Sequence, residues 1–137
     1  MVNPRDGAST AWLGFSSAMK KWNDKFYPLM KENAAAFVDA AIIELELIFQ
    51  RYVCPKAVRG DERLKTFMSS HPSDYDPDSD AIEDIESGAT KTIIYVQSKT
   101  GFQDRFRYTM ARRGAEWKVS MREVYDDVSE KWKTHHI

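Results

Sequence analysis

The order of hydrophobic patterns along the chain predicts one α+β domain, with three N-terminal helices followed by an antiparallel meander of about four strands. Two observations carry this prediction. Before residue 69 the large apolar residues recur every three or four positions, which is the spacing of helices packed on a core. From residue 81 onward they alternate with polar residues, which is the spacing of half-buried strands.

The first two helices are predicted from their apolar stripes and from the residues that interrupt them. A cap at residues 9–10 starts the first helix, and Asn23 and Asp24 indicate its end. Pro28 suits the first turn of the second helix, because the N–H that proline lacks has no partner there. Pro55 ends this second helix. Its apolar stripe consists of Ala34, Phe37, Ala41, Leu45, Ile48 and Tyr52.

A short third helix is expected after Gly60, with Asp61 as its cap. The strands then cover a weaker segment, residues 81–86, and three clearer ones at 90–99, 102–111 and 117–121. Residues 1–137 are interpreted as one domain with a flexible N-terminus, residues 1–8. The strand residues expected to point inward are Ile94, Val96, Phe106, Tyr108, Met110, Trp117, Val119 and Met121.

Composition excludes several classes of protein. The chain has 137 residues and a net charge of −1, so it lacks the overall charge that attracts nucleic acid or anionic lipid. No apolar run approaches the roughly 18 residues of a membrane span, and a single cysteine cannot form a disulfide framework. We therefore expect a cytoplasmic protein that uses no cofactor, no membrane and no direct contact with nucleic acid.

The most unusual segment is "SHPSDYDPDSD", residues 70–80, followed directly by "AIEDIE". A calcium-binding EF-hand loop starting at the first aspartate is excluded, because Ser79 and Ile85 occupy the positions that need glycine and glutamate. Three interpretations stay open: a calcium site of another type, a solvated connection, and a surface that steers a basic partner. The acids in this segment are Asp74, Asp76, Asp78, Asp80, Glu83, Asp84 and Glu86.

The sequence contains no convincing catalyst. His71 lies beside a proline, and His135 and His136 lie at the C-terminus, where chains are usually poorly ordered. Cys54 has no histidine near it in sequence, which favours a structural role. Asp104 alternates with inward positions and could act as a base, but its place three residues after a turn favours a solvated carboxylate. We therefore assign no catalytic, cofactor-binding or metal-binding residue.

Four segments in order carry a resemblance to a known family: "YVCPK", "PSDYDP", "IIYVQSKTGFQDRFRYTMARRGAEWKV" and "EKWK". Together they resemble bacterial immunity proteins with a nuclear transport factor 2-like fold. The similarity extends from Trp12 to the C-terminus and is densest over residues 93–119. It implies three helices packed on a curved, cone-like antiparallel sheet. It also implies a non-catalytic protein that binds and neutralises a cognate toxin domain encoded by an adjacent gene.

The resemblance gives the acidic segment a role as part of the toxin-binding surface. Tyr75 would be its aromatic anchor, since buried aromatic side chains tend to carry binding energy while charges set the association rate. The predicted contact residues are Asp74, Tyr75, Asp76, Asp78, Asp80, Glu83, Glu86, Asp126 and Asp127.

Two further hypotheses follow from the same fold. A small isomerase- or dehydratase-like enzyme would use Asp104 in an open cavity inside the cone. A homodimer could form through the outer sheet face, where Ile93 and Tyr95 are expected to be partly apolar.

Overall fold

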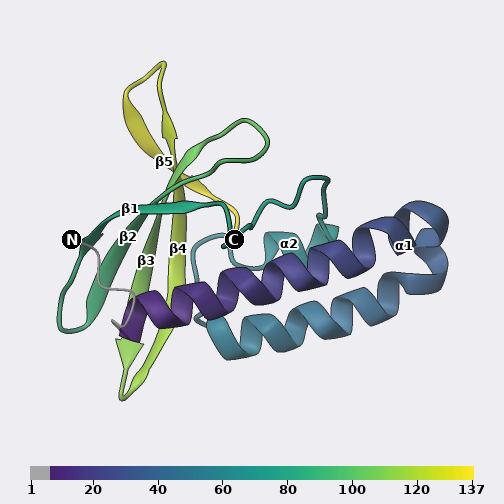
Figure 1. The fold of residues 1–137 in the computed structure, drawn as a ribbon. Helices are drawn as coiled ribbons and strands as arrows, with labels where there is room; N and C mark the ends of the chain where they lie inside the picture. Colours follow the sequence, from purple (N-terminus) through teal and green to yellow (C-terminus); the bar gives the residue numbers. More distant parts are fainter. Residues whose placement is uncertain (1–6) are drawn as a thin grey trace.

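The computed structural model describes residues 7–137 and places a helical hairpin and a short helix against a five-stranded antiparallel sheet (Figure 1). The strands pair in chain order, β1-β2-β3-β4-β5. The predicted α+β class is confirmed, with one strand more than expected. In chain order the elements are α1 (Gly7–Tyr52), α2 (Glu62–Thr66), β1 (Ala81–Glu86), β2 (Lys91–Gln97), β3 (Arg105–Arg113), β4 (Glu116–Asp126) and β5 (Lys131–His135).

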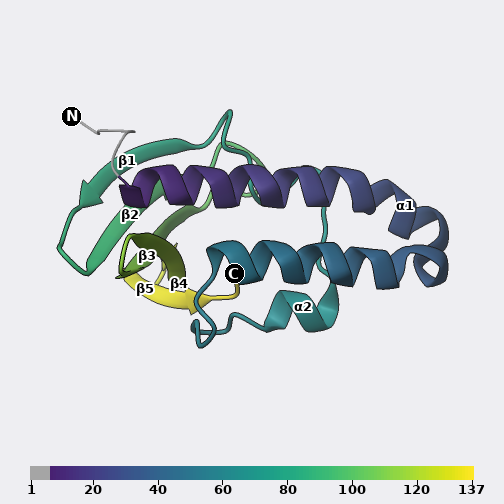
Figure 2. The same cartoon turned by 90° about the horizontal axis from the view of Figure 1, so that it is seen from below.

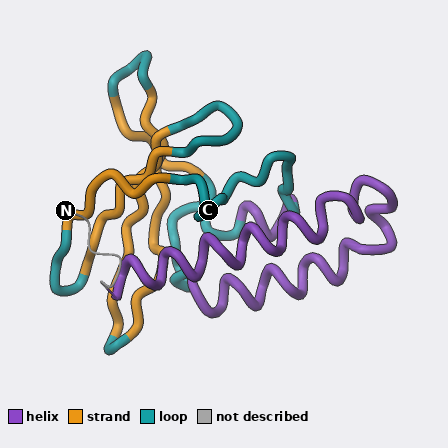
Figure 3. The backbone as a smooth tube through the Cα atoms, viewed as in Figure 1, coloured by secondary structure: helices purple, strands orange, loops and turns teal. Residues whose placement is uncertain are grey.

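The long helix α1 folds back on itself into two antiparallel arms (Figure 1, Figure 3). The break lies at Asn33, whose φ of −156° and ψ of 87° are not helical. The predicted end at Asn23 and Asp24, with a restart at Pro28, is wrong. Asn23 is buried inside the first arm, where its amide exchanges two hydrogen bonds with the backbone of Ser70 at 2.8 and 2.9 Å. Its polar side chain therefore anchors a loop and does not end the helix.

The two arms are joined by polar contacts as well as by apolar packing. The Trp22 indole N–H donates to the Ala41 carbonyl at 2.9 Å, and Lys25 pairs with Glu44 at 2.8 Å. The described part of the first arm begins at Gly7, before the expected cap, and Ala8 and Ser9 are already fully buried. Of the predicted flexible segment, residues 1–6 lie outside the described part of the chain.

The core lies where the sheet curves round the N-terminal part of α1 (Figure 2). The Trp12 ring packs at 5.5 Å from that of Tyr108, and the Phe15 ring at 5.2 Å from that of Tyr75, measured between centroids. Aromatic rings from the first arm of α1 thus occupy the concave side of the sheet. The fully buried apolar residues of the sheet include Ile94, Val96, Tyr108, Met110 and Val119.

Strand β4 contains a bulge that shifts its alternation by one residue. Thr109 of β3 pairs with Met121, but the next residue, Met110, pairs with Val119, so Ser120 is left over. An extra residue in one strand of an antiparallel pair reverses which face the following side chains occupy. Every prediction made by strict alternation beyond Ser120 is therefore inverted.

The inversion exchanges two side chains. Met121, predicted to point inward, shares the outer face with Thr109, so this prediction is wrong. Arg122, the residue after it, is turned into the core and is 0% exposed. The connection after α1 contributes to the bulge, because the Val58 N–H donates to the Ser120 carbonyl at 2.9 Å.

The C-terminal residues form an ordered edge of the sheet. β5 pairs with the second half of β4, and Ile137 beyond it is fully buried. The expectation that His135 and His136 are poorly ordered is wrong, because these side chains pack into the structure. None of the helices in residues 7–137 combines the length and apolarity that crossing a membrane requires.

Candidate functional site

An ion cluster lies beneath the acidic segment. The Arg122 guanidinium makes two hydrogen bonds to the Asp74 carboxylate, at 2.8 and 2.9 Å, and Arg63 of α2 adds a third at 2.7 Å. The segment that the sequence presents as an acidic surface thus sends its first carboxylate inward. This one carboxylate joins α2 and β4 to the connection of residues 70–80, here called the acidic loop.

Electrostatics keep this cluster ionised. Burial by itself would raise the pKa of Asp74, but the Arg122 charge and hydrogen bonds, with the Arg63 charge, hold that pKa well below its ordinary value. The Arg122 guanidinium also lies over the ring of Phe106 at 3.9 Å and that of Tyr75 at 4.6 Å. Aromatic faces stabilise a desolvated cation, so the buried arginine is held by both a carboxylate and rings.

Tyr75 is only 2% exposed, and its ring lies in the core beside Phe15. Its hydroxyl donates to the Ile137 carbonyl at 3.3 Å. Tyr75 therefore does not lie at the surface, where the predicted aromatic anchor would have to be. The physical reason is local: the chain bends at Asp74, and the tyrosine ring lies inward, 4.6 Å from the guanidinium of Arg122.

Another predicted contact acid, Asp80, braces the loop that carries it. The carboxylate of Asp80 accepts from the backbone N–H of Asp76 at 3.3 Å and from that of Lys99 at 3.4 Å. Burial raises the pKa of Asp80. Asp78 lies between them and is exposed. The acidic loop is therefore folded against the β2–β3 connection.

The remaining predicted acids lie on the outer surface of the sheet and at one of its turns. Glu83 faces Arg105 at 3.6 Å, and the exposed Glu86 accepts from the Tyr95 hydroxyl at 3.0 Å. Asp126 closes the β4–β5 turn by accepting from Ser129 at 2.9 Å and from Lys133 at 2.7 Å. Asp127 beside it is exposed.

The outer sheet face carries a cluster that sequence reasoning missed. The Trp132 ring lies between those of Tyr125 and Tyr95, at centroid distances of 5.3 and 5.8 Å. Arg107 lies 4.6 Å over Trp132 and forms a bidentate pair with Glu123 at 2.8 and 3.0 Å. The face expected to be partly apolar therefore carries an ion pair beside its aromatic rings. The residue that could have indicated this cluster is Trp132, which lies in β5, a strand that was not predicted from the sequence.

A hollow of about 470 Å³ opens above the ion cluster. Residues 68–74 form one wall, and the β2–β3 connection with Phe102 and Asp104 forms another. Phe102 is 96% exposed, whereas His135 and His136 are partly buried in the lining. Burial, assisted by His135 and the nearby arginine charges, lowers the pKa of His136 to about 4, so this imidazole is neutral at neutral pH.

The chain matches the model of the NTF2 fold immunity protein family over residues 8–136. It belongs to this family. It is also similar to immunity protein RhsIA of Dickeya dadantii (strain 3937), with 29% identity over 124 residues that cover 90% of each protein. No solved structure matches it. Membership confirms the family that the four segments resembled, and with it the function of an immunity protein that binds and neutralises a cognate toxin.

The fold of this immunity protein gives Asp104 no interior position. β3 begins at Arg105, so Asp104 precedes the strand and is exposed at the rim of the hollow. The floor of the hollow is closed by Asp74 and Arg63, whose charges already satisfy each other. Within residues 7–137, no three His, Cys, Asp or Glu side chains are grouped so as to hold a metal ion.

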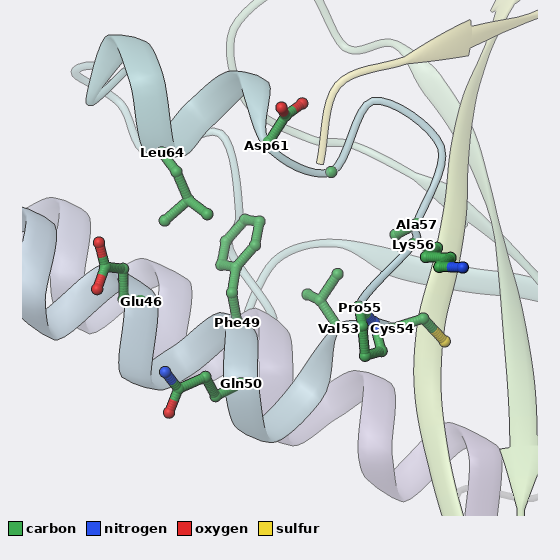
Figure 4. Close-up of a pocket in the computed structure, with 11 residues that line it drawn as sticks. Glu46, Phe49, Gln50, Val53, Cys54, Pro55, Lys56, Ala57, Asp61 and Leu64 are labelled. Atoms are coloured by element: carbon green, nitrogen blue, oxygen red, sulfur yellow. The ribbon is translucent and has the colours of Figure 1, made fainter.

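Cys54 borders a second hollow, of about 620 Å³, between the second arm of α1 and the connection to α2 (Figure 4). Its sulfur points away from this hollow toward β4, where the thiol lies 3.8 Å from the Lys118 carbonyl. Burial raises the pKa of the Cys54 thiol, so the reactive thiolate is disfavoured. The apolar part of the lining comes from Phe49, Val53, Pro55, Ala57 and Leu64.

Proposed function

We propose that this immunity protein neutralises its toxin by stoichiometric binding in the cytoplasm, without catalysis, and that the toxin domain is encoded by an adjacent gene. The observation that carries the proposal is the filled interior of the cone. The rings of Trp12, Phe15 and Tyr108, with the ion pair of Arg122 and Asp74, occupy the space that an enzyme of this fold would need for a substrate. Binding at the outer surface is the function this architecture supports best.

The proposed contact surface is a set of acids on the outside of the sheet and on the loops at its ends. Exposed carboxylates create a local negative field, which raises the association rate and the specificity for a basic partner. Of the acids predicted from the sequence, Asp78, Glu83, Glu86 and Asp127 are exposed, and Asp126 is partly so. The carboxylates of Asp74 and Asp80 hold the acidic loop in place from beneath, and Asp76 is partly buried between them.

The proposal involves no membrane and no direct contact with nucleic acid. It includes the possible homodimer formed through the outer sheet face, on which Ile93 and Tyr95 are partly exposed. The Arg107–Glu123 pair on the same face makes that assembly more polar than the sequence alone suggests.

Calorimetric titration against the toxin domain of the adjacent gene, at low and high salt, tests the proposal. We expect tight one-to-one binding that weakens with salt, because screening reduces attraction between exposed charges. The double variant Asp78→Lys/Glu86→Lys should lose about tenfold or more in affinity and most of the salt dependence. The matched control, Glu32→Lys/Glu116→Lys, reverses two exposed acids elsewhere and should bind as the wild type does.

Two further readouts complete the experiment. Mass spectrometry of the toxin after prolonged incubation should find it chemically unchanged, and sedimentation should reveal whether one or two copies of each protein associate. A wild-type protein that fails to bind the toxin, or that converts it chemically, would refute capture. Binding with no salt dependence would remove the acidic contact surface and leave capture intact.

A further inference from the structure

The C-terminal segment, residues 135–137, is held by side chains from α2 and from the acidic loop. The main-chain oxygen of Ile137 accepts from Arg63 at 2.9 Å and from the Tyr75 hydroxyl at 3.3 Å. The Ile137 side chain is fully buried, and two views place this end of the chain beside α2 (Figure 1, Figure 2). The segment therefore fastens the edge strand β5 to two parts of the molecule that lie outside the sheet.

Arg63 is the residue at which these contacts meet. Its Nε donates to Ile137, its Nη1 to the Met68 carbonyl, and its Nη2 to the Asp74 carboxylate at 2.7 Å. All three nitrogen atoms of this guanidinium are thus occupied within the protein. Displacing Ile137 would leave Nε without an acceptor in a side chain that is 3% exposed, so α2, the acidic loop and the C-terminal segment depend on one another.

The charges at this junction are unequal in number. Arg63 and Arg122 are buried cations, and both form their ion pairs with the one carboxylate of Asp74. Asp80 also attracts Arg122, but its carboxylate is bonded to backbone N–H groups of the loops. A further positive charge here would be repelled by two guanidinium groups, and a buried charge without a partner is costly.

The two histidines of the C-terminal segment lie at this junction. Their ring centroids are 4.1 Å apart, and the His135 ring packs edge-on against that of Phe106 at 5.7 Å. The His136 Nε2 lies 3.4 Å from Nη2 of Arg63. An arginine can only donate, so this contact is a hydrogen bond only while Nε2 carries no proton. Protonation of His136 turns it into a contact between two donors that are both cations.

The other charges near His136 do not offset that repulsion. Glu62 of α2 is engaged, because its carboxylate accepts from Arg59 at 2.8 Å. Across the hollow of about 470 Å³, His71 and Asp104 are exposed, so water screens their charges. Burial and the cations of the junction therefore determine the charge of this imidazole, and they lower the pKa of His136 to about 4.

We propose that residues 135–137 form a pH-sensitive switch, in which mild acid detaches them from α2 and the acidic loop while strands β1 to β4 stay paired. Protonated His136 leaves the Arg63 guanidinium for water, and the Ile137 contacts break with it. The hollow that both histidines line then loses part of its wall. Residues 81–126, which include β1 to β4, contain no histidine, so no imidazole is protonated within their pairing. Detachment takes place in the free protein, whatever surface meets the toxin.

Amide hydrogen exchange at several low urea concentrations separates detachment from unfolding. Detachment exposes little surface, so its opening equilibrium should hardly respond to urea, whereas unfolding of β2 and β3 should respond steeply. In the detached state His136 regains its ordinary pKa of 6.5, so protons favour that state between pH 6.5 and about 4. Lowering the pH from about 7.5 to about 5 should therefore raise the opening equilibrium of α2, residues 70–75 and residues 135–137 about 30-fold.

The variant His136→Gln identifies the group that responds, because its side-chain amide can accept from Arg63 but binds no proton. It should have the wild-type protection at neutral pH and lose the response to acid. His71→Gln, which replaces an exposed histidine, is the matched control and should keep the response. The difference between the two variants isolates the imidazole that contacts Arg63.

Each of three results would overturn the inference. Equal acid responses of His136→Gln and the wild type would assign the response to another group. Exchange of residues 135–137 with the same urea dependence as β2 and β3 at both pH values would mean that they open only by global unfolding. The third result needs no variant: a His136 imidazole that titrates at its ordinary pKa of 6.5 in NMR spectra of the folded wild type would show that protonation does not oppose docking.

Discussion

At the scale of single residues, Arg122 is a fully buried charge in the interior. It is buried among the rings of Tyr75, Phe106 and Tyr108, and its charge is balanced by Asp74, 48 residues earlier in the chain. A buried charge is costly unless it is paired and hydrogen-bonded. The bidentate contact pairs this charge through Nη1 and Nη2 and fixes the acidic loop over the sheet, whereas the buried Nε has no hydrogen-bond partner among the described residues.

We expect Arg122→Met to lower the free energy of unfolding by about 3 kcal/mol, because Asp74 then keeps only Arg63 as a counterion in a largely dehydrated site. Urea unfolding measures this loss. Arg113→Met, which removes an exposed arginine of β3, is the control and should change the free energy by less than about 0.5 kcal/mol. A loss for Arg122→Met no larger than that of the control would show that the cluster contributes nothing to stability.

At the scale of elements, the position of the break in α1 determines which residues face the sheet. Asn33 has a non-helical backbone, and its side-chain oxygen accepts from the Ala36 N–H at 3.3 Å, which caps the start of the second arm. The first arm therefore runs past Pro28 without interruption. This length lets Trp22 reach the Ala41 carbonyl across the hairpin.

Replacing the cap should weaken the hairpin. Asn33→Ala is expected to lower the free energy of unfolding by about 1 kcal/mol, because an alanine side chain cannot accept the hydrogen bond. The measurement is a denaturant titration followed by helical circular dichroism. Glu32→Ala, one residue earlier and equally exposed, should leave the transition where it is, and an equal effect of both substitutions would argue against a capping role.

At the scale of the whole molecule, the C-terminal residues join parts that are distant in sequence. The Ile137 carbonyl accepts from Arg63 of α2 at 2.9 Å and from Tyr75 of the acidic loop. His136 lies 3.4 Å from the Arg63 guanidinium, and its ring stacks 4.1 Å from that of His135. Protonation of either imidazole would place another cation beside two buried arginines.

This arrangement predicts a loss of stability on mild acidification. His136 has an ordinary pKa of 6.5, which burial and the neighbouring cations lower to about 4 in the folded protein. Between these values the unfolded chain binds a proton that the folded one does not, so the free energy of unfolding falls as the pH is lowered from 6.5 to about 4. Asp74 stays ionised in this range because the arginines hold its pKa low.

Urea unfolding across that pH range measures the effect. His136→Asn should reduce the pH dependence, with His135 accounting for part of what is left because burial lowers its pKa too. The control His71→Asn replaces an exposed histidine and should keep the wild-type slope. Equal slopes for His136→Asn and the wild type would mean that protonation of this residue is not linked to folding.

The fold class could be predicted from the sequence because it depends on local periodicity. The stripe of the second helical arm and the alternation in β2 and β3 report which side of each element is buried, whatever lies opposite. The family could be recognised for a related reason, because the densest resemblance, over residues 93–119, covers most of β2, all of β3 and the start of β4. β5 escaped prediction because it has only five residues and its burial alternates weakly.

The contact surface stays a prediction, and the structure shows only where its residues lie. The exposed acids Asp78, Glu83 and Glu86 lie on loops or on the outer face, as their charge suggested. Asp74 and Tyr75 were misjudged because their partners are distant in sequence. No local pattern could indicate that a tyrosine between two aspartates would be buried beside Arg122.

The sequence by itself thus determined the order and type of most elements, the apolar faces of β2 and β3, and the family to which the chain belongs. Tertiary structure alone decided which charges are internal. The bulge at Ser120 reverses the alternation of β4, and it is defined by pairing with β3 and with the connection at Val58. A one-residue shift moves Arg122 from solvent to core, and Asp74 must then follow, because a buried guanidinium is stable only with a counterion.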